Sequence, residues 1–328
     1  MVDTVRSGAN TDGVGLASRR AIFAGGSAEL FQKPPVLLLV VGSFLAVSTV
    51  IAKAAPLAGW HPLALLQWAI FGGAIGLFAI NRAFAGSRRV DTAQGGAGRG
   101  RLIGYLVMSG LLFIAPNMIA VMAAPEVGAG FVSLSFAFPL VLTYAFAVLL
   151  RIERFQLLRV TGVLFGLTGG LLLAVSGADL SVEASWWSLV ALLIPVFLAT
   201  GNIFRTYYWP EGAKPVDLAL GMMATGFLAL AAFNAAMGIS MVPQSWTPMA
   251  TGLIAAQIAI FAVQYGLYFR LQQTAGPVYL SQIGSVAAVV GLGLGYAVFG
   301  EVPNAAKLAA VASVGAGIVL VSLGRRGR

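Results

Sequence analysis

The sequence predicts an all-α polytopic membrane protein with ten transmembrane helices, built as two inverted five-helix repeats with both termini in the cytoplasm. Only 9% of its 328 residues are charged, against roughly 25% in soluble domains, and the mean hydropathy is +0.90. Uncharged stretches long enough to cross a bilayer recur along the chain. Lys and Arg lie in short clusters between these stretches, which is the pattern of a multi-pass membrane protein.

The chain begins with residues 1–33, which are rich in Gly, Ala and Ser and are expected to form a disordered cytoplasmic tail. A cleaved signal peptide over 33–55 is the alternative for the first apolar run. That run is longer than the apolar core of a signal peptide, and its removal would leave an odd number of spans. We therefore interpret it as the first membrane span.

Two apolar stretches need division before the spans can be counted. The stretch 54–81 contains the breaker sequence PLAGWHP, so its helix is expected to begin near Pro62. The stretch 218–269 is too long for one crossing and is divided at 240–248, where SMVPQSWTP suits an interfacial turn. The ten predicted spans are 34–54, 62–81, 102–123, 127–150, 158–177, 186–206, 216–237, 248–270, 276–299 and 305–323.

The positive residues set the orientation. With the N-terminus inside, 18 of the 20 Lys and Arg residues lie on the cytoplasmic side, and only Lys53 and Lys307 lie near the outer side. The segment 82–101, rich in Gly and Arg, is interpreted as a cytoplasmic linker. The predicted organisation is a tail 1–33, a first repeat 34–178, an outer connecting loop 179–185, a second repeat 186–324 and a basic cytoplasmic end 325–328.

An internal repeat supports the division into halves. A shift of 148 residues places Gly128, Ser133, Glu153 and Gly169 on Gly276, Ser281, Glu301 and Gly317. A shift of 153 residues places Pro62, Leu65 and Gly73 on Pro215, Leu218 and Gly226. Each repeat holds five spans, an odd number, so the second repeat must lie inverted in the membrane.

The same stretches resemble the EamA-type branch of the drug/metabolite transporter superfamily over residues 34–324. The resemblance is carried by AAPEVGAGFVSLSFAFPLVLTYAFAVLLRIER with LLRVTGVLFGLTGGLLL, and by GPVYLSQIGSVAAVVGLGLGYAVFGEVP with AAVASVGAGIVLVSLG. Glu301 follows Gly300 as in the family's Gly-Glu ending of the fourth helix of a repeat, whereas Glu153 follows Ile152 and departs from it. The resemblance implies a ten-span fold and export of amino acids, metabolites or drugs.

Polar residues in the middle of a span are costly in lipid, so they usually face the protein interior or a water-filled cavity. Gln257, Gln264 and Tyr268 recur on one face of the span 248–270. The candidate substrate cavity is lined by Thr49, Lys53, Asn117, Ser133, Asn202, Gln257, Gln264, Tyr265, Tyr268, Ser281, Gln282 and Ser285. For each residue taken singly, the alternative is a hydrogen bond between neighbouring helices.

Charged residues lie at the ends of the predicted spans, where they can mark topology or contact the substrate. Lys53 either extends to the outer interface or faces the cavity and pairs with an anionic group of the substrate. Arg151 and Arg154 surround Glu153 at the inner end of one span, and Glu301 stands at the outer end of the equivalent span. We expect these clusters to mark topology without binding substrate. No Asp or Glu lies in the middle third of a span, which disfavours a proton relay.

These observations favour a secondary transporter of the bacterial inner membrane that exports a small organic solute by alternating access around a cavity between the repeats. A channel or a non-transporting receptor is the first alternative. An intramembrane lipid-modifying enzyme is the second, although the sequence shows no cluster of acids or histidines for catalysis. With no Cys and one His, no metal or other cofactor is expected, and the scattered positive charge argues against nucleic acid. The expected partners are the solute and the lipid bilayer, and a homodimer is left open.

Overall fold

The computed structural model describes residues 33–84, 96–151, 154–176, 182–302 and 304–325. Most of the predicted tail 1–33 and of the basic end 325–328 lies outside these ranges, as do Glu153 and residues 179–181 of the predicted outer connection 179–185. Residues 182–185 of that connection belong to α8. Within them the regular elements are all helices and no strand is present. They are α2 (Pro34–Ala54), η1 (Pro56–Ala58), α3 (Pro62–Phe84), α4 (Gly96–Val127), α5 (Ala129–Ser135), α6 (Pro139–Leu149), α7 (Leu157–Ser176), α8 (Val182–Ala191), α9 (Ile194–Tyr207), α10 (Pro215–Ala236), α11 (Pro248–Leu280), α12 (Ile283–Phe299) and α13 (Ala305–Arg325).

Seven helical segments in the described ranges are long and apolar enough to cross a membrane. Five of them lie in α2, α3, α4, α10 and α11, and the other two are the pairs α5–α6 and α8–α9. Three shorter apolar helical segments, Leu157–Gly166, Ile283–Phe299 and Ala305–Gly317, lie among them. This confirms the prediction of an all-α protein with several helices suited to a membrane.

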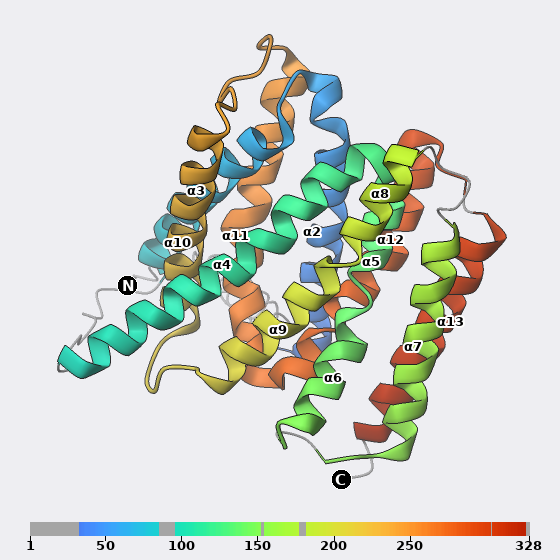
Figure 1. The fold of residues 1–328 in the computed structure, drawn as a ribbon. Helices are drawn as coiled ribbons and strands as arrows, with labels where there is room; N and C mark the ends of the chain where they lie inside the picture. Colours follow the sequence, from blue (N-terminus) through green and yellow to red (C-terminus); the bar gives the residue numbers. More distant parts are fainter. Residues whose placement is uncertain (1–32, 85–95, 152–153, 177–181, 303, 326–328) are drawn as a thin grey trace, which may run out of the picture.

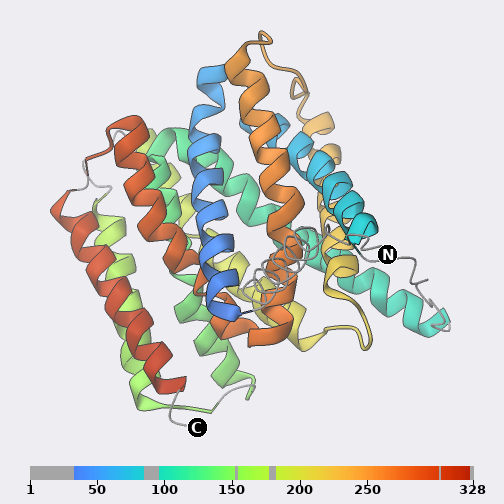
Figure 2. The ribbon, with the colours of Figure 1, turned by 180° about the vertical axis from the view of Figure 1, so that it is seen from behind.

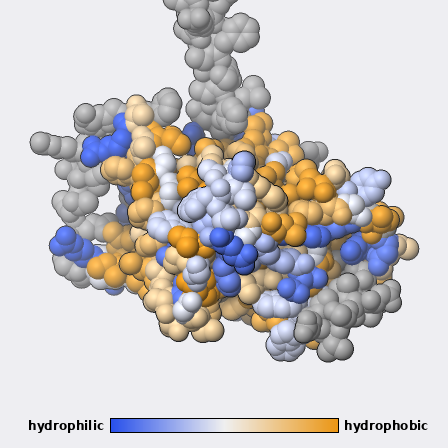
Figure 3. All heavy atoms as spheres, turned by 90° about the horizontal axis from the view of Figure 1, so that it is seen from above, coloured by the Kyte–Doolittle hydropathy of each residue, from blue (hydrophilic) through white to orange (hydrophobic). Residues whose placement is uncertain are grey.

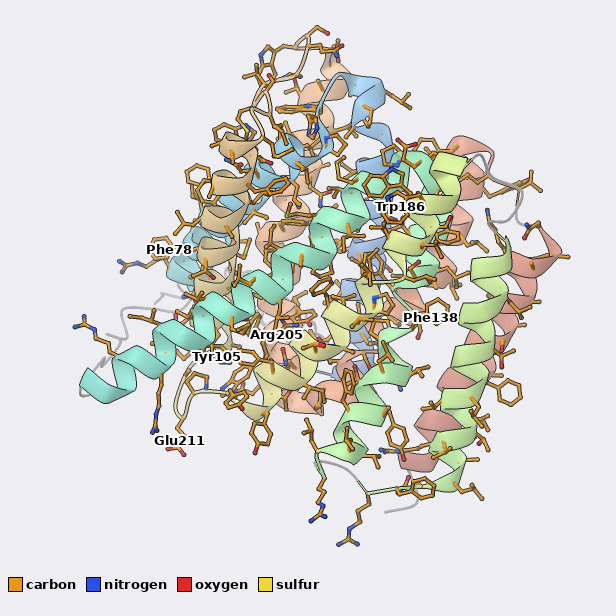
Figure 4. All side chains as sticks on the ribbon, viewed as in Figure 1. Phe78, Tyr105, Phe138, Trp186, Arg205 and Glu211 are labelled. Carbon is orange, nitrogen blue, oxygen red and sulfur yellow. The ribbon has the colours of Figure 1, made fainter. Side chains whose placement is uncertain are left out.

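Large apolar side chains cover the outside of the bundle, as a lipid environment requires. On α3, Phe71, Ile75 and Phe78 lie on one face at helical spacing, and between 43% and 54% of each is exposed. Phe78 points away from the bundle in Figure 4. Viewed from above, blue and pale hydrophilic residues gather near the middle of that end of the molecule, with hydrophobic residues around them (Figure 3). The bundle is therefore apolar along its sides and more polar at this end.

The helices pack in pairs that join distant parts of the chain. The helix α3 packs on α11, α10 packs on α4, and α2 packs on α12. The pair α7 and α13 stands at one side of the bundle, and α4 runs obliquely across the face seen in Figure 1. Figure 2 shows the opposite face, where α2, α11 and α12 lie side by side. Gly317 lets α13 approach α7, because a Cβ there would lie 2.6 Å from the carbonyl oxygen of Gly162.

The helix α4 is longer than the predicted span 102–123, because it begins at Gly96 and ends at Val127. The predicted linker 82–101 is therefore helical at residues 82–84, which belong to α3, and at 96–101, which belong to α4. A helix can continue beyond the apolar layer because its backbone hydrogen bonds are internal, while exposed Arg99 and Arg101 carry its first turns into water. Pro116 and Pro125 lie inside this helix without ending it.

Three predicted spans are discontinuous in the structure. The span 127–150 is divided into α5 and α6 by a turn at 136–138, and the span 186–206 is divided into α8 and α9 at 192–193. The chain between the predicted spans 248–270 and 276–299 stays helical as far as Gly276, where φ is 78°, and a second break follows at 281–282. Hydropathy alone predicted unbroken helices, because 136–138 and 192–193 are as apolar as their neighbours, and the polar Ser281 and Gln282 were interpreted as cavity residues within a continuous helix.

Candidate functional site

A small cavity lies between α2, α3, α4 and α11. Its volume is about 30 Å³, which is room for about two water molecules. Its polar lining consists of Ser48, Thr49, Asn117 and Gln257, and the rest of the lining is apolar. Three of the residues predicted for a substrate cavity, Thr49, Asn117 and Gln257, therefore meet around one space. In the state described, that space is too small for an organic solute.

Hydrogen bonds between helices hold the polar groups near this cavity. The Gln257 side-chain amide donates to the Ser48 hydroxyl at 2.9 Å, and the Thr49 and Ser133 hydroxyls are hydrogen-bonded at 2.6 Å. The side-chain oxygen of Gln257 is buried and has no donor among the described residues. The Asn117 side chain donates to the carbonyl of Phe113, one turn earlier in α4, at 2.7 Å. The cavity thus keeps one buried acceptor, on Gln257, that a ligand or water would satisfy.

An ion pair lies at the end of α2 that the charge pattern assigns to the outer side. Lys53, in the last turn of α2, pairs with Glu301, which follows α12. The Glu301 carboxylate also accepts hydrogen bonds from the backbone N–H groups of Ala129 at 3.0 Å and Gly130 at 3.1 Å. These are the first residues of α5, where the positive end of the helix dipole favours an anion. One carboxylate therefore joins three helices.

The backbone around this carboxylate is shaped to admit it. A Cβ at Gly128, Gly130 or Gly295 would lie between 2.7 and 3.0 Å from an oxygen of Glu301. Burial raises the pKa of Glu301, but hydrogen bonds from Lys53 and the two α5 amides, together with the Lys53 charge, outweigh burial and hold that pKa below its usual value. Lys53 is paired within the protein, so neither predicted role describes it in this state. Sequence reasoning also missed the capping of α5 by Glu301.

A second polar group lies at the end of α9 that the charge pattern assigns to the inner side. The Tyr268 hydroxyl on α11 donates to the Asn202 side-chain oxygen on α9 at 2.6 Å. One terminal nitrogen of Arg205 (Nη2) donates to the same oxygen at 3.1 Å and to Tyr268 at 2.8 Å. The Gln272 amide donates to the Asn202 carbonyl at 3.1 Å and to the Thr206 hydroxyl at 3.0 Å. Asn202 and Tyr268 were predicted as site residues, whereas Arg205 was interpreted only as a topology charge.

The remaining predicted residues lie between these two groups or at the helix breaks. Tyr265 is buried against the rings of Phe113 and Phe261, with ring centroids 4.9 and 5.0 Å away. Gln264 is buried with no partner for its side-chain oxygen among the described residues. The serines and glutamine near the second break are buried as well, and these are Ser281, Gln282 and Ser285. None of these lines the small cavity described above.

The structure therefore places the predicted residues in two groups rather than around one cavity. Gln257 and Tyr268, on the same helix, are 11 residues apart, which is about 16 Å along the axis. The signal that could have indicated Arg205 is its position inside the predicted span 186–206 and one turn after Asn202. In the described part of the chain, no group of three His, Cys, Asp or Glu side chains lies together as metal ligands would.

Comparison with known proteins bears on the fold alone. Neither a protein-family model nor a curated protein matches this sequence. Among solved structures, 28 chains match its fold. One of them, described only as "Crystal structure of protein", is similar over 92% of this chain and 99% of its own, with a TM-score of 0.57 and 20% sequence identity.

Proposed function

We propose that this protein is a secondary transporter of the bacterial inner membrane that exports a small organic solute by alternating access. The observation that carries the proposal is the meeting of two broken helices inside the bundle. A Cβ at Gly284, beside the break before α12, would overlap the carbonyl of Phe136 in the break between α5 and α6. Helices interrupted at membrane depth, beside a polar cavity, are a recurrent feature of secondary transporters. The resemblance of the sequence to EamA-type transporters supports the same function.

Ten spans in two inverted repeats account for the way the helices pack. The repeat shifts align α3 with α10 and α4 with α11. They therefore map the packed pair α3 and α11 onto the packed pair α10 and α4. Gly128 and Gly276, 148 residues apart, both have positive φ. Phe136 and Gly284 are also 148 residues apart and touch each other, as equivalent residues on a twofold axis would. In this proposal α7, α12 and α13 also span the membrane.

Opening toward the outside requires the Lys53–Glu301 ion pair to break. That pair ties α2 to the end of α12, and Glu301 ties both to the first turn of α5. The cavity lined by Thr49, Asn117 and Gln257 lies on the same half of the bundle and holds only about two water molecules. We take this as a state closed to the outside. Release of the carboxylate would free α5 from two neighbours and enlarge the cavity.

Counterflow tests the proposal against its alternatives. Full-length protein is reconstituted in proteoliposomes that are preloaded with unlabelled amino acids, small organic acids or dyes, and the uptake of the matching labelled solute is followed. A carrier gives saturable uptake that depends on the preloaded solute. Equal leakage of every solute would instead support a channel. Binding of a solute without any flux would support a receptor.

A further inference from the structure

Arg205 carries a buried positive charge that no described carboxylate neutralises. The side chain is 2% exposed and lies in the last turn of α9. Among the described residues, the one salt bridge joins Lys53 to Glu301, and Glu211, the acid nearest to Arg205 in sequence, is exposed. Figure 4 shows Arg205 within the outline of the bundle, beside α9, and Glu211 at the lower edge of the molecule. A buried guanidinium without an anion is costly, and arginine cannot lower that cost by losing its proton.

The hydrogen-bonding capacity of Arg205 is only partly used. Its Nη2 atom donates to Asn202 and Tyr268, which are both neutral. Its Nε and Nη1 atoms are buried and have no acceptor among the described residues. Buried donors are nearly always satisfied, so these two nitrogens indicate a ligand that supplies acceptor oxygens. Because the donors belong to a cation, an anionic ligand would bind best.

The surroundings of Arg205 limit the charge and shape of that ligand. Arg270, the next basic residue on the neighbouring helix α11, is exposed, so Arg205 is the buried cation at this position. One guanidinium balances one negative charge, which favours a carboxylate over a phosphate dianion. The Tyr268 ring lies 5.5 Å from the guanidinium, and Tyr105 stacks on Phe204 beside it with ring centroids 5.7 Å apart. Aromatic side chains suit the apolar body of an organic acid.

We propose that Arg205 binds the carboxylate of the transported solute, and that the solute class is organic monocarboxylates. That the bound acid is transported rests on the proposed function. That an acid binds at Arg205 rests on the buried cation alone. Asn202 and Tyr268 hold the guanidinium in place while the site is empty. When the solute binds, its carboxylate accepts from the two nitrogens that lack partners here. The cytoplasmic position of the site, at the inner end of α9, suits loading for export.

Matched pairs of acid and amide test the binding site. Thermal unfolding of the full-length protein in detergent is followed by tryptophan fluorescence with phenylacetate against phenylacetamide, butyrate against butyramide, and inorganic phosphate. We expect at least one acid to stabilise the protein where its amide does not, with phosphate ineffective. Arg205→Gln should weaken binding of that acid at least about 10-fold, as expected for lost hydrogen bonds from a charged group. Arg205→Lys keeps the charge and should retain part of the affinity.

The controls separate a folding defect from a lost site. Arg270→Gln removes a positive charge from the same end of the bundle, but from an exposed position, and should leave the acid preference unchanged. The proposal is overturned if no acid is preferred to its amide, if phosphate binds as well as the acids, or if folded Arg205→Gln protein keeps the preference. Counterflow of the same acid separates the two proposals. Acid binding without flux would remove the transport function and leave the site, whereas flux unaffected by Arg205→Gln would remove the site and leave the transporter.

Discussion

The cations Lys53 and Arg205 lie near the ends of α2 and α9, two helices that the proposed repeat aligns, but the two charges have different partners. Lys53 has a carboxylate partner in Glu301, and its ammonium also lies 4.6 Å from the centre of the Phe299 ring. Arg205 has only neutral partners within the described part of the chain, Asn202 and Tyr268. A cation already paired with an acid gains little from a second anion, whereas an unpaired one gains much. We therefore assign closure of the outer side to Lys53 and ligand binding to Arg205.

Glu301 should make the stability of the protein dependent on acid. Its pKa in the folded protein lies below the ordinary value of 4.5, so its stabilising effect is complete above pH 4.5 and is lost as the pH falls through the lower folded value. We expect the difference in melting temperature between wild type and Glu301→Gln to shrink as the pH falls from about 6 to about 3. The exposed acid variant Glu211→Gln is the control and should differ little from wild type throughout. A constant difference for Glu301→Gln would contradict the assignment.

The same substitution should open the outer side of the cavity. Because the chain has no Cys, Ala120→Cys alone provides a reporter in the cavity lining. We expect Glu301→Gln to raise the labelling rate of this cysteine several-fold when a membrane-impermeant maleimide is added outside intact cells, since the neutral amide no longer holds Lys53. Glu211→Gln in the same background should not change the rate. Unchanged labelling with Glu301→Gln would mean that the ion pair does not close this path.

At the residue scale, the sequence indicated some of the residues that form the polar contacts and missed others. Asn202 and Tyr268 were both named from the sequence, because each is a polar residue within an apolar span, and they meet at 2.6 Å. The contact between Lys53 and Glu301 joins residues 248 positions apart and has no local signal. Arg205 was misread because an arginine near a span end normally marks the cytoplasmic side. Its burial depends on the packing of α4, α9 and α11, which hydropathy does not describe.

At the scale of elements, the helix starts marked by a proline were predictable and the breaks were not. The helices α2, α3, α10 and α11 begin at Pro34, Pro62, Pro215 and Pro248, each within one residue of the predicted start. Proline suits the first turn of a helix, where its missing N–H has no partner to lose. The break at 136–138 lies in a wholly apolar sequence, where only the following Pro139 indicates that a helix could be interrupted.

The contact between the two breaks should be intolerant of added volume. Gly284→Ala places a methyl group against the carbonyl of Phe136, which is backbone and cannot turn away. We expect a loss of about 1–3 kcal/mol or more in stability, seen as a lower melting temperature, with transport reduced further. Gly293→Ala is a matched control on the same helix, because nothing lies within 4 Å of the added Cβ. Equal melting temperatures for the two variants would show that the helices do not approach so closely.

At the scale of the whole molecule, the proposed ten-span topology predicts that two exposed loops lie on opposite sides of the membrane. Gln244 lies in the connection between α10 and α11, and Glu211 lies between α9 and α10. In intact cells, we expect Gln244→Cys to react with an impermeant maleimide and Glu211→Cys to react only after permeabilisation. The absence of native cysteines makes each label specific. Labelling of both from outside would contradict the ten-span arrangement.

The lone guanidinium of Arg205 has an electrical consequence. If Arg205 remains in place while a monocarboxylate leaves, each transport cycle carries one negative charge out of the cell. An inside-negative membrane potential favours that movement by about 2.3 kcal/mol for each 100 mV. Export would then run on voltage alone, so a proton-relaying acid would be unnecessary, and the sequence has no Asp or Glu in the middle of a predicted span. Proteoliposomes held at an inside-negative voltage should release a preloaded acid faster than depolarised ones.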